Sequence, residues 1–285
     1  MNRSQCGMVL LSLAALHSTA HGQASERATT VDAAKGKWLP VLQKHATEYV
    51  IAVTEPSGKK TTKLRPDPLM RWSQPVRGGE DGVICLWVEA GRPVTVMSFF
   101  TLKAGDGKRW IVHEHQSLSP RPLEASWQGR EMWHTATPGV VFAPVPDAPA
   151  PADSAPARSR QMQQILSDFS ANTIDNKKVS WPLRALPKPL YRYENTGSEV
   201  LDGGLFTLAQ GTDPEALILL EARIDGKQTR WYYGAARLTD LNLRVRFKDR
   251  EILSVPYTVG RSDEPYQTFI VINKASDRPE DFVRP

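Results

Sequence analysis

Residues 68–93, PLMRWSQPVRGGEDGVICLWVEAGRP, align without a gap with residues 189–214, PLYRYENTGSEVLDGGLFTLAQGTDP. The shift from position 68 to position 189 is 121 residues, and it also places Arg109 and Trp110 on Arg230 and Trp231. The paired residues are Pro68 and Pro189, Leu69 and Leu190, Arg71 and Arg192, Trp72 and Tyr193, Asp81 and Asp202, Gly82 and Gly203, and Pro93 and Pro214. Because the spacing is nearly constant, we expect an internal duplication that gives two halves with one fold.

The duplication helps to assign secondary structure. Residues 216–224, ALILLEARI, have helical propensity, but their counterpart VTVMSFFTL at 94–102 is rich in β-branched and aromatic residues. We therefore predict strands at both places. Turn signals such as EDG and LDGG, which contain Asp81 and Asp202, divide each half into about five extended runs and indicate an antiparallel meander.

A helix is predicted ahead of each meander. In KWLPVLQKHATEYVIAV, residues 37–53, the apolar residues recur at helical spacing as far as Tyr49 and Val50. In SRQMQQILSDFSANTI, residues 159–174, they do the same after Ser159, a suitable N-cap. The predicted fold class is therefore α+β, with two related halves that each consist of an N-terminal helix and an antiparallel β-meander sheet.

The segment between the halves is dominated by Pro and Ala. Residues 143–157, APVPDAPAPADSAPA, have the composition of an extended, semi-rigid linker. We therefore expect a first repeat at 25–142 and a second at 158–285.

The N-terminus has the pattern of an export signal. Arg3 precedes the apolar GMVLLSLAAL, and small residues allow cleavage after Ala20 or Ala24, so we expect residues 1–24 to be a signal peptide. No later apolar run approaches the length of a transmembrane helix, and a secreted or periplasmic location is predicted. Cys85 is then the only cysteine of the mature chain, and its apolar surroundings favour a buried, unreactive thiol.

The charge pattern argues against nucleic-acid binding. The formal net charge is +5, which becomes +4 without Arg3, and the basic residues are scattered among acidic ones.

The most distinctive polar cluster is HEH at His113, Glu114 and His115. On a strand the two histidines share a face that Glu114 does not, so they could chelate zinc, with His134 as a third ligand. At the shift of 121 they fall on Gly234 and Ala236, which restricts any such site to the first half. A metal-binding protein or metal-dependent hydrolase centred on His113 and His115 is one hypothesis. Buried or solvent-facing structural histidines are the other interpretation.

Arg71 and Arg192 form the second candidate site. Arginines at equivalent places in two halves could clamp an anionic ligand. The alternative, which we favour, is a structural role, in which the arginines stack on the adjacent Trp72 and Tyr193 and the Asp-Gly pairs at Asp81 and Asp202 form hairpin turns.

No phosphate-binding loop, dinucleotide fingerprint or serine-hydrolase elbow is present. The leading functional hypothesis is therefore an exported, non-catalytic binding or interaction protein rather than an enzyme, and no cofactor is expected. Its partner would be an unidentified small molecule, a glycan or an envelope protein.

The segments RWSQPVRGGEDGVICLW, HEHQSLSP and LAQGTDPEALILLEAR, together with the Pro/Ala linker and the SRQMQQI helix, resemble an uncharacterised family of secreted proteins in planctomycete bacteria. The resemblance covers most of the mature chain. It implies export and a two-part architecture, and it implies no catalytic residue because the family has no assigned activity.

Overall fold

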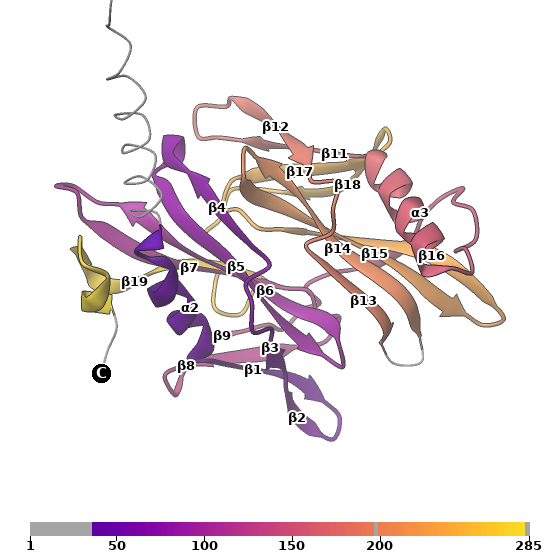
Figure 1. Ribbon diagram of the computed structural model, residues 1–285, viewed down its shortest axis with the longest axis horizontal. Coiled ribbons are helices and arrows are strands. Elements are labelled where there is room, and N and C mark those ends of the chain that lie inside the picture. The colour runs from indigo at the N-terminus through magenta and orange to yellow at the C-terminus, as the bar shows by residue number, and fades with distance from the viewer. Residues whose placement is uncertain (1–35, 197–198, 283–285) are drawn as a thin grey trace, which may run out of the picture. The chain divides into compact units, whose positions relative to one another are not determined.

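The computed structural model describes residues 36–196 and 199–282, which form mostly antiparallel β-sheet with two α-helices (Figure 1). The predicted signal peptide, with Ala20 and Ala24, lies outside the described residues. None of the described helices is both long enough and apolar enough to cross a membrane.

The first helix is shorter than the sequence predicts. Helix α2 covers Leu39–Thr47 and buries Val41, Leu42, His45 and Ala46 on one face. Tyr49 and Val50, expected in the helix, belong instead to strand β1, Tyr49–Glu55. The prediction was wrong there because burial alternates along β1, with Tyr49 inside and Val50 outside, which is the period of a strand.

The second helix begins earlier than predicted. Helix α3 covers Ala155–Ser167 with Ser154 at the N-cap and Pro156 in its first turn, so Ser159 lies inside the helix and is not its cap. Its buried residues include Met162, Ile165 and Leu166, as the helical spacing predicts.

The N-terminal region, residues 39–144, continues after α2 and β1 with strands and one 3-10 turn. These are β2 (Gly58–Thr61), β3 (Lys63–Leu64), β4 (Met70–Gln74), η1 (Pro75–Arg77), β5 (Gly79–Glu89), β6 (Arg92–Lys103), β7 (Arg109–Ser117), β8 (Leu123–Trp127), β9 (Arg130–His134) and β10 (Phe142–Pro144).

The C-terminal region, residues 155–282, continues after α3 in a similar order. Its elements are β11 (Phe169–Ile174), β12 (Ser180–Ala185), β13 (Tyr191–Thr196), β14 (Val200–Gln210), β15 (Asp213–Asp225), β16 (Gln228–Arg237), β17 (Asn242–Phe247), β18 (Arg250–Val255), β19 (Tyr266–Ser276) and η2 (Pro279–Phe282). The predicted strands at 94–102 and 216–224 are confirmed as parts of β6 and β15.

The pairing is more complex than a meander. Strands β4 to β7 and β13 to β16 do pair in sequence order. However, β1 pairs with β8, and β11 pairs with β17, so the first strand of each region returns to pair with a late one. The expected five-strand meanders are therefore only partly formed.

The last strand of each region pairs with the other region. Strand β10 pairs with β16. Strand β19 pairs with β7 (Figure 1). Strand β19 thereby becomes the edge of a six-stranded sheet in which five strands follow the order β19-β7-β6-β5-β3 and the sixth, β4, also pairs with β5, whereas β10 joins the nine-stranded sheet. The described residues from Trp38 onward group into one compact unit.

The two Asp-Gly pairs are not turns. Asp81 and Gly82 lie within β5, and Asp202 and Gly203 lie within β14, with both aspartates buried. Each pair adjoins a register shift between neighbouring strands, between Gly79 and Gly82 in one case and between Val200 and Asp202 in the other. The hairpin prediction was wrong because a strand irregularity with glycine looks the same in sequence as a tight turn.

The central strands are apolar on both faces because both faces are covered. In β5, Cys85 and Trp87 face the core beneath α2, whereas Ile84 and Leu86 face a second core. This second core is shared by the two regions and includes Leu217 and Leu219 of β15 on its other side. Burial raises the pKa of the Cys85 thiol to about 12, in agreement with the expected buried, unreactive cysteine.

The Pro/Ala segment 143–157 is held against the C-terminal region. Val145 is buried, and its backbone N–H donates to the carbonyl of Trp231. Gln161 of α3 bonds to the backbone of Ala150 and Ala152. The segment is therefore bound along its length, and its last three residues form the first turn of α3.

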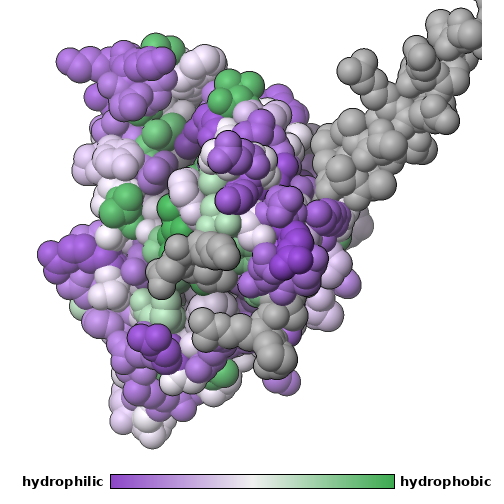
Figure 2. All heavy atoms as spheres, turned by 90° about the vertical axis from the view of Figure 1, so that its left-hand side faces the viewer, coloured by the Kyte–Doolittle hydropathy of each residue, from purple (hydrophilic) through white to green (hydrophobic). Residues whose placement is uncertain are grey.

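Figure 2 shows the side of the molecule that lies on the left in Figure 1. Outside the grey atoms, this face is mostly hydrophilic, and its hydrophobic residues form separate groups. The exposed apolar surface visible there is thus divided among small areas.

Candidate functional site

His113 and His115 lie on one face of β7, as predicted, and both are fully buried. Two residues from the first helix and strand join them. His113 Nε2 lies 2.8 Å from His45 Nδ1, and His113 Nδ1 lies 2.8 Å from the hydroxyl of Tyr49. His115 Nε2 lies 3.2 Å from the same hydroxyl. We call His45, Tyr49, His113 and His115 the histidine network.

The hydrogen bonds within the network are consistent with three neutral rings, with His115 Nδ1 left without a hydrogen-bond partner among the described residues. His45 Nε2 must donate to the carbonyl oxygen of Phe282, 3.0 Å away, so His45 Nδ1 accepts from His113. His113 Nδ1 then accepts from the Tyr49 hydroxyl, which in turn accepts from His115. Protonating His113 would make its Nδ1 a donor, so the Tyr49 hydroxyl would have to accept from it instead of donating to it.

Burial enforces this neutral state. It lowers the pKa of His45, and it lowers the pKa of His113 well below the usual value, with like charge on the neighbouring histidines adding to the effect. It also lowers the pKa of His115 to about 3, an effect that the Gln267 side chain partly offsets. The network therefore behaves as a polar part of the core at neutral pH.

His134, the third predicted metal ligand, is not brought to this network. It lies on β9, half-exposed, and its Nδ1 contacts Glu131 at 2.9 Å. Trp133, the preceding residue, stacks on His115, so His134 points to the opposite face of the strand. Among the residues that the structure describes, no group of three or more histidine, cysteine or acidic side chains is placed to hold a metal ion. Zinc binding at His113 and His115 stays a prediction, which elemental analysis of the protein would test.

The strand register changes the comparison between the two regions. Val83 and Gly204 are equivalent positions at the shift of 121. Val83 pairs with Phe99, and Gly204 pairs with Leu220, so Leu220 is the counterpart of Phe99. Phe99 in turn pairs with His113. Leu220 pairs with Tyr233. By register, His113 therefore corresponds to Tyr233 and His115 to Ala235, one residue from the positions that the shift of 121 indicates.

Arg71 and Arg192 each bind the aspartate of their own region. Arg192 makes two hydrogen bonds to Asp202, at 2.7 and 3.1 Å, and one to the carbonyl of Ala155 at 2.9 Å. Arg71 is half-exposed, with its Nη2 3.9 Å from Asp81 Oδ1. The sequence did not predict these ion pairs, and the stacking of the arginines on Trp72 and Tyr193 stays a prediction. The clamping of one anionic ligand by both arginines stays a prediction.

A cavity lies where β4, η1, β6 and β7 of one region meet β15, the 238–240 loop and β19 of the other. Its volume is about 440 Å³. Its apolar lining includes Trp72, Phe100, Leu102, Val112, Leu238, Phe269 and Ile270. Its polar lining includes Arg77, Glu114, Asp213, Glu215, Asp240 and Tyr266.

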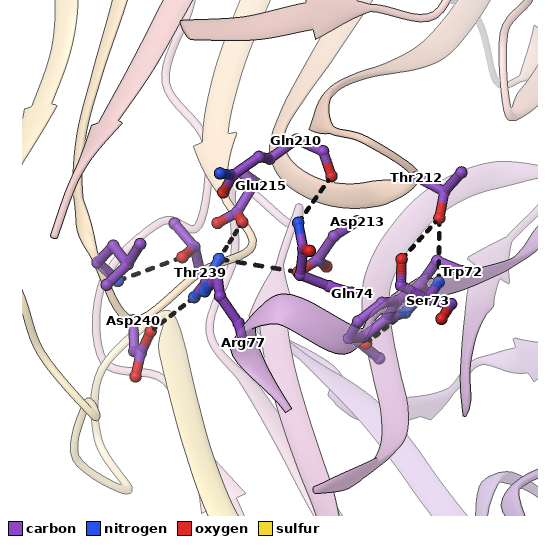
Figure 3. A network of polar contacts seen from close by, with 12 residues as sticks. Trp72, Ser73, Gln74, Arg77, Gln210, Thr212, Asp213, Glu215, Thr239 and Asp240 are labelled. Atoms are coloured by element: carbon purple, nitrogen blue, oxygen red, sulfur yellow. Dashed lines mark hydrogen bonds and ion pairs between the residues drawn. The ribbon is translucent and has the colours of Figure 1, made fainter. Parts of the chain in front are cut away.

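Arg77 is the centre of the charged groups in the cavity (Figure 3). Its guanidinium is hydrogen-bonded to Glu215 and lies 3.8 Å from Asp213 and 3.7 Å from Asp240. Nearby, the hydroxyl of Thr212 bonds to the backbone N–H and carbonyl of Ser73, at 3.0 and 2.9 Å, which joins β4 to the β14–β15 turn. Arg77 and its three acidic neighbours therefore come from different regions that specific contacts hold together.

Glu114 faces the cavity from the side of β7 opposite the histidines. The hydroxyl of Tyr266 donates to Glu114 Oε1 at 2.7 Å, and the guanidinium of Arg237 lies over the Tyr266 ring, 4.5 Å from its centroid. The side chains of the HEH motif thus lie on opposite faces of β7, with the two histidines in the core and the glutamate in the cavity.

Burial disfavours negative charge in the cavity. It raises the pKa of Glu114 to about 8, and the nearby Asp240 and Glu215 add to this rise. It likewise raises the pKa of Asp213 well above its usual value, reinforced by Glu215, and raises that of Glu215 against the opposing effect of Arg77. Burial also opposes the charge on Arg77, but Glu215, Asp213 and Asp240 outweigh it and raise the pKa of Arg77.

Comparisons with protein-family models, curated proteins and solved structures found no match to this chain. Its possible chemistry must therefore be derived from the geometry of the cavity and of the histidine network.

Most of the cavity residues were not among the candidate site residues predicted from the sequence. Asp213 lies in the aligned stretch that ends at Pro214, where it suggests a turn, and Glu215 directly precedes ALILLEARI. An acidic residue at the start of a strand buried on both faces is the signal that could have identified Glu215. No local signal could have placed Arg77 beside it, because the two are 138 residues apart.

Proposed function

We propose that this protein is an exported, non-catalytic binding protein that holds a small molecule in the cavity around Arg77. The observation that carries the proposal is the cavity itself. A volume of about 440 Å³ with apolar walls and a few convergent polar groups is typical of sites for small organic ligands.

A secreted or periplasmic location is part of this proposal. Its support is the sequence of residues 1–24, with a basic residue, a short apolar run and small residues at the cleavage positions. Membership of the secreted planctomycete family is likewise proposed on the segments quoted above.

We also propose that residues 25–142 and 158–285 descend from one duplicated unit. Three pairs of contacts support it: β1–β8 corresponds to β11–β17, β5–β6 to β14–β15, and β10–β16 to β19–β7. The position of Asp213 in the cavity corresponds at the shift of 121 to Arg92, so the two copies have diverged at the site. The two copies would originally have had equivalent positions here, and the ligand-binding cavity would be present at only one of them.

The test is a thermal-shift screen of neutral, anionic and cationic small molecules against the wild type and Leu102→Trp. Leu102 lines the cavity and is half-buried, so a larger side chain there should occupy the cavity without entering the core. We expect at least one compound to raise the Tm of the wild type by several degrees and to leave Leu102→Trp unchanged, because a ligand stabilises only the protein that binds it.

If every active compound shifts the two proteins equally, the ligand does not bind in this cavity. A broad screen in which no compound stabilises the wild type would count against a small-molecule function.

A further inference from the structure

The polar end of the cavity contains more acid than base. Four carboxyl groups, those of Glu114, Asp213, Glu215 and Asp240, line it together with the single guanidinium of Arg77. Tyr266 adds a hydroxyl that is already bound to Glu114. Because these carboxyl groups can release protons when a cation lies among them, the site favours a positive charge over an anion.

One acceptor in the cavity is buried without a partner. Glu215 is 1% exposed, and its Oε1 binds Arg77, whereas its Oε2 makes no hydrogen bond of good geometry among the described residues, although the nearby Thr239 side chain helps to lower the pKa of Glu215. A buried carboxylate oxygen in this condition is unfavourable unless a donor reaches it. Because Glu215 lines the cavity, a ligand is placed to supply that donor.

The remaining walls are apolar. Phe100, Leu102 and Val112 approach from β6 and β7, and Ile270, which pairs with Val112, approaches from β19. An ion that kept its water shell would leave these walls in contact with water. A ligand with an apolar body would instead cover them.

We propose that the cavity binds an organic amine, whose ammonium group donates to Glu215 Oε2 and lies among the carboxyl groups while its apolar body packs on Phe100, Leu102 and Ile270. This inference rests on the proposed small-molecule function and specifies its ligand class. A bare metal ion fits less well, because its ligands must converge on one point, and no such group of three or more residues occurs in the described part of the chain.

Binding of the amine should release protons. The groups that face Glu114 are Asp240, Glu215, Arg77 and Tyr266, with Asp213 beside them. With its pKa raised to about 8, Glu114 is mainly protonated at pH 7. An ammonium ion beside it favours the carboxylate, so the affinity for the amine should rise between pH 6 and pH 8 by up to about tenfold per pH unit for each proton released.

The experiment is isothermal titration of the whole protein with n-hexylamine, n-hexanol, hexanoate and calcium chloride. The three organic compounds match in size and differ in charge, which separates the effect of the ammonium group from that of the apolar chain. We expect hexylamine to bind at least tenfold more tightly than hexanol at pH 8, and hexanoate and calcium to bind more weakly still. Repeating the hexylamine titration in buffers of different ionisation enthalpy counts the protons released.

Three variants assign the binding to the cavity. Glu215→Gln should weaken hexylamine at least tenfold and leave hexanol unchanged, and Leu102→Trp should weaken both. Glu131→Gln, which removes an exposed carboxylate from β9, is the control and should change neither. If Glu215→Gln does not fold, Asp240→Asn at the half-exposed rim should weaken hexylamine severalfold.

The outcomes separate the ligand class from the function. Tighter binding of hexanol, hexanoate or calcium than of hexylamine, or hexylamine binding that Glu215→Gln and Asp240→Asn leave intact, overturns the amine proposal. Hexanol binding that Leu102→Trp abolishes would still support the small-molecule function. If none of the organic compounds binds, the amine proposal fails, and the broader screen decides the function.

Discussion

Gly82 and Gly203 each lie beneath an aromatic ring of the neighbouring strand. Gly82 pairs with Trp72, and a Cβ on Gly82 would lie 2.2 Å from that ring. Gly203 pairs with Tyr193, and its Cβ would lie 2.5 Å from the ring. The absence of a side chain lets the ring lie flat on the strand, so glycine is required at both positions.

Gly82→Ala should therefore destabilise the protein by about 1–3 kcal/mol, because the ring of Trp72 or the backbone must move. Urea unfolding followed by circular dichroism measures this. The control is Gly105→Ala in the β6–β7 turn, where a Cβ would have no atom within 4 Å, and we expect a change within about 0.5 kcal/mol. Equal effects of the two variants would contradict the packing described for Trp72.

The histidine network makes the protein sensitive to acid. Below pH 6.5 the unfolded chain takes up a proton on each of these histidines, whereas the folded chain does not until its lowered pKa values are reached, about 3 for His115. The unfolded state then binds more protons than the folded state, so the free energy of unfolding falls as the pH falls.

His115→Phe should reduce this pH dependence. Each buried histidine contributes up to about 1.4 kcal/mol per pH unit below pH 6.5, so the slope should fall by about that amount. Urea midpoints between pH 7.5 and pH 4.5 measure it. Met97→Leu, a change of the fully buried residue that pairs with His115, should alter stability but not the slope. An unchanged slope in His115→Phe would mean that His115 is already charged in the folded protein.

At the scale of elements, helix α3 is attached to the sheet by a buried ion pair. Arg158 Nε lies 2.7 Å from Asp202 Oδ2, and the same guanidinium donates to the carbonyls of Ala152 and Asp153. Arg158 thus connects the helix, the preceding Pro/Ala segment and β14.

We predict that Arg158→Met destabilises the protein by about 3 kcal/mol, at the lower end of the usual cost of breaking a buried pair, because Asp202 keeps Arg192 as a partner. Arg160→Met on the exposed side of the same helix should change stability by less than about 0.5 kcal/mol. Chemical denaturation of both variants checks the prediction, which fails if they are equally stable.

Helices and strands could be predicted from the sequence where a long stretch of residues showed one consistent pattern. The strands β6 and β15 could be predicted because the aligned segments resolved an ambiguous propensity. The end of α2 could not be predicted from helical spacing, because Leu42, Ala46, Tyr49 and Val50 fit a helix that tertiary packing ends at Thr47. The alignment at a shift of 121 matches β7 with β16 one residue away from the match that the strand register gives. An error of one residue assigns each side chain to the wrong face of the strand.

At the scale of the whole molecule, the cavity could not be predicted from the sequence. Glu114 and Arg77 belong to the N-terminal region, and Asp213, Glu215 and Tyr266 belong to the C-terminal one. Their meeting depends on the contact between β4 and the β14–β15 turn and on the pairing of β19 with β7. Neither contact leaves a periodic pattern in the sequence.

The pairing of β10 with β16 and of β19 with β7 allows a prediction of how the protein behaves when its chain is cut between the two regions. If a protease site is inserted between Pro149 and Ala150, the two cleaved parts should remain associated, because β10 stays paired with β16 and β19 stays paired with β7. Size-exclusion chromatography should show one species of unchanged size in buffer and two in denaturant. Separation of the parts in buffer would contradict the pairing. The uncut chain with the same insertion is the control.

The pairing of β7 with β19 also governs the order in which the protein can be completed. Gln116 pairs with Tyr266, so 266 minus 116, or 150 residues, separate the partners along the chain. During synthesis β7 emerges long before β19 and must wait with one edge unpaired. A truncated product without β19 keeps the edge of β7 unpaired. We therefore expect such a product to be bound by chaperones or degraded, whereas pairing with β19 covers this edge.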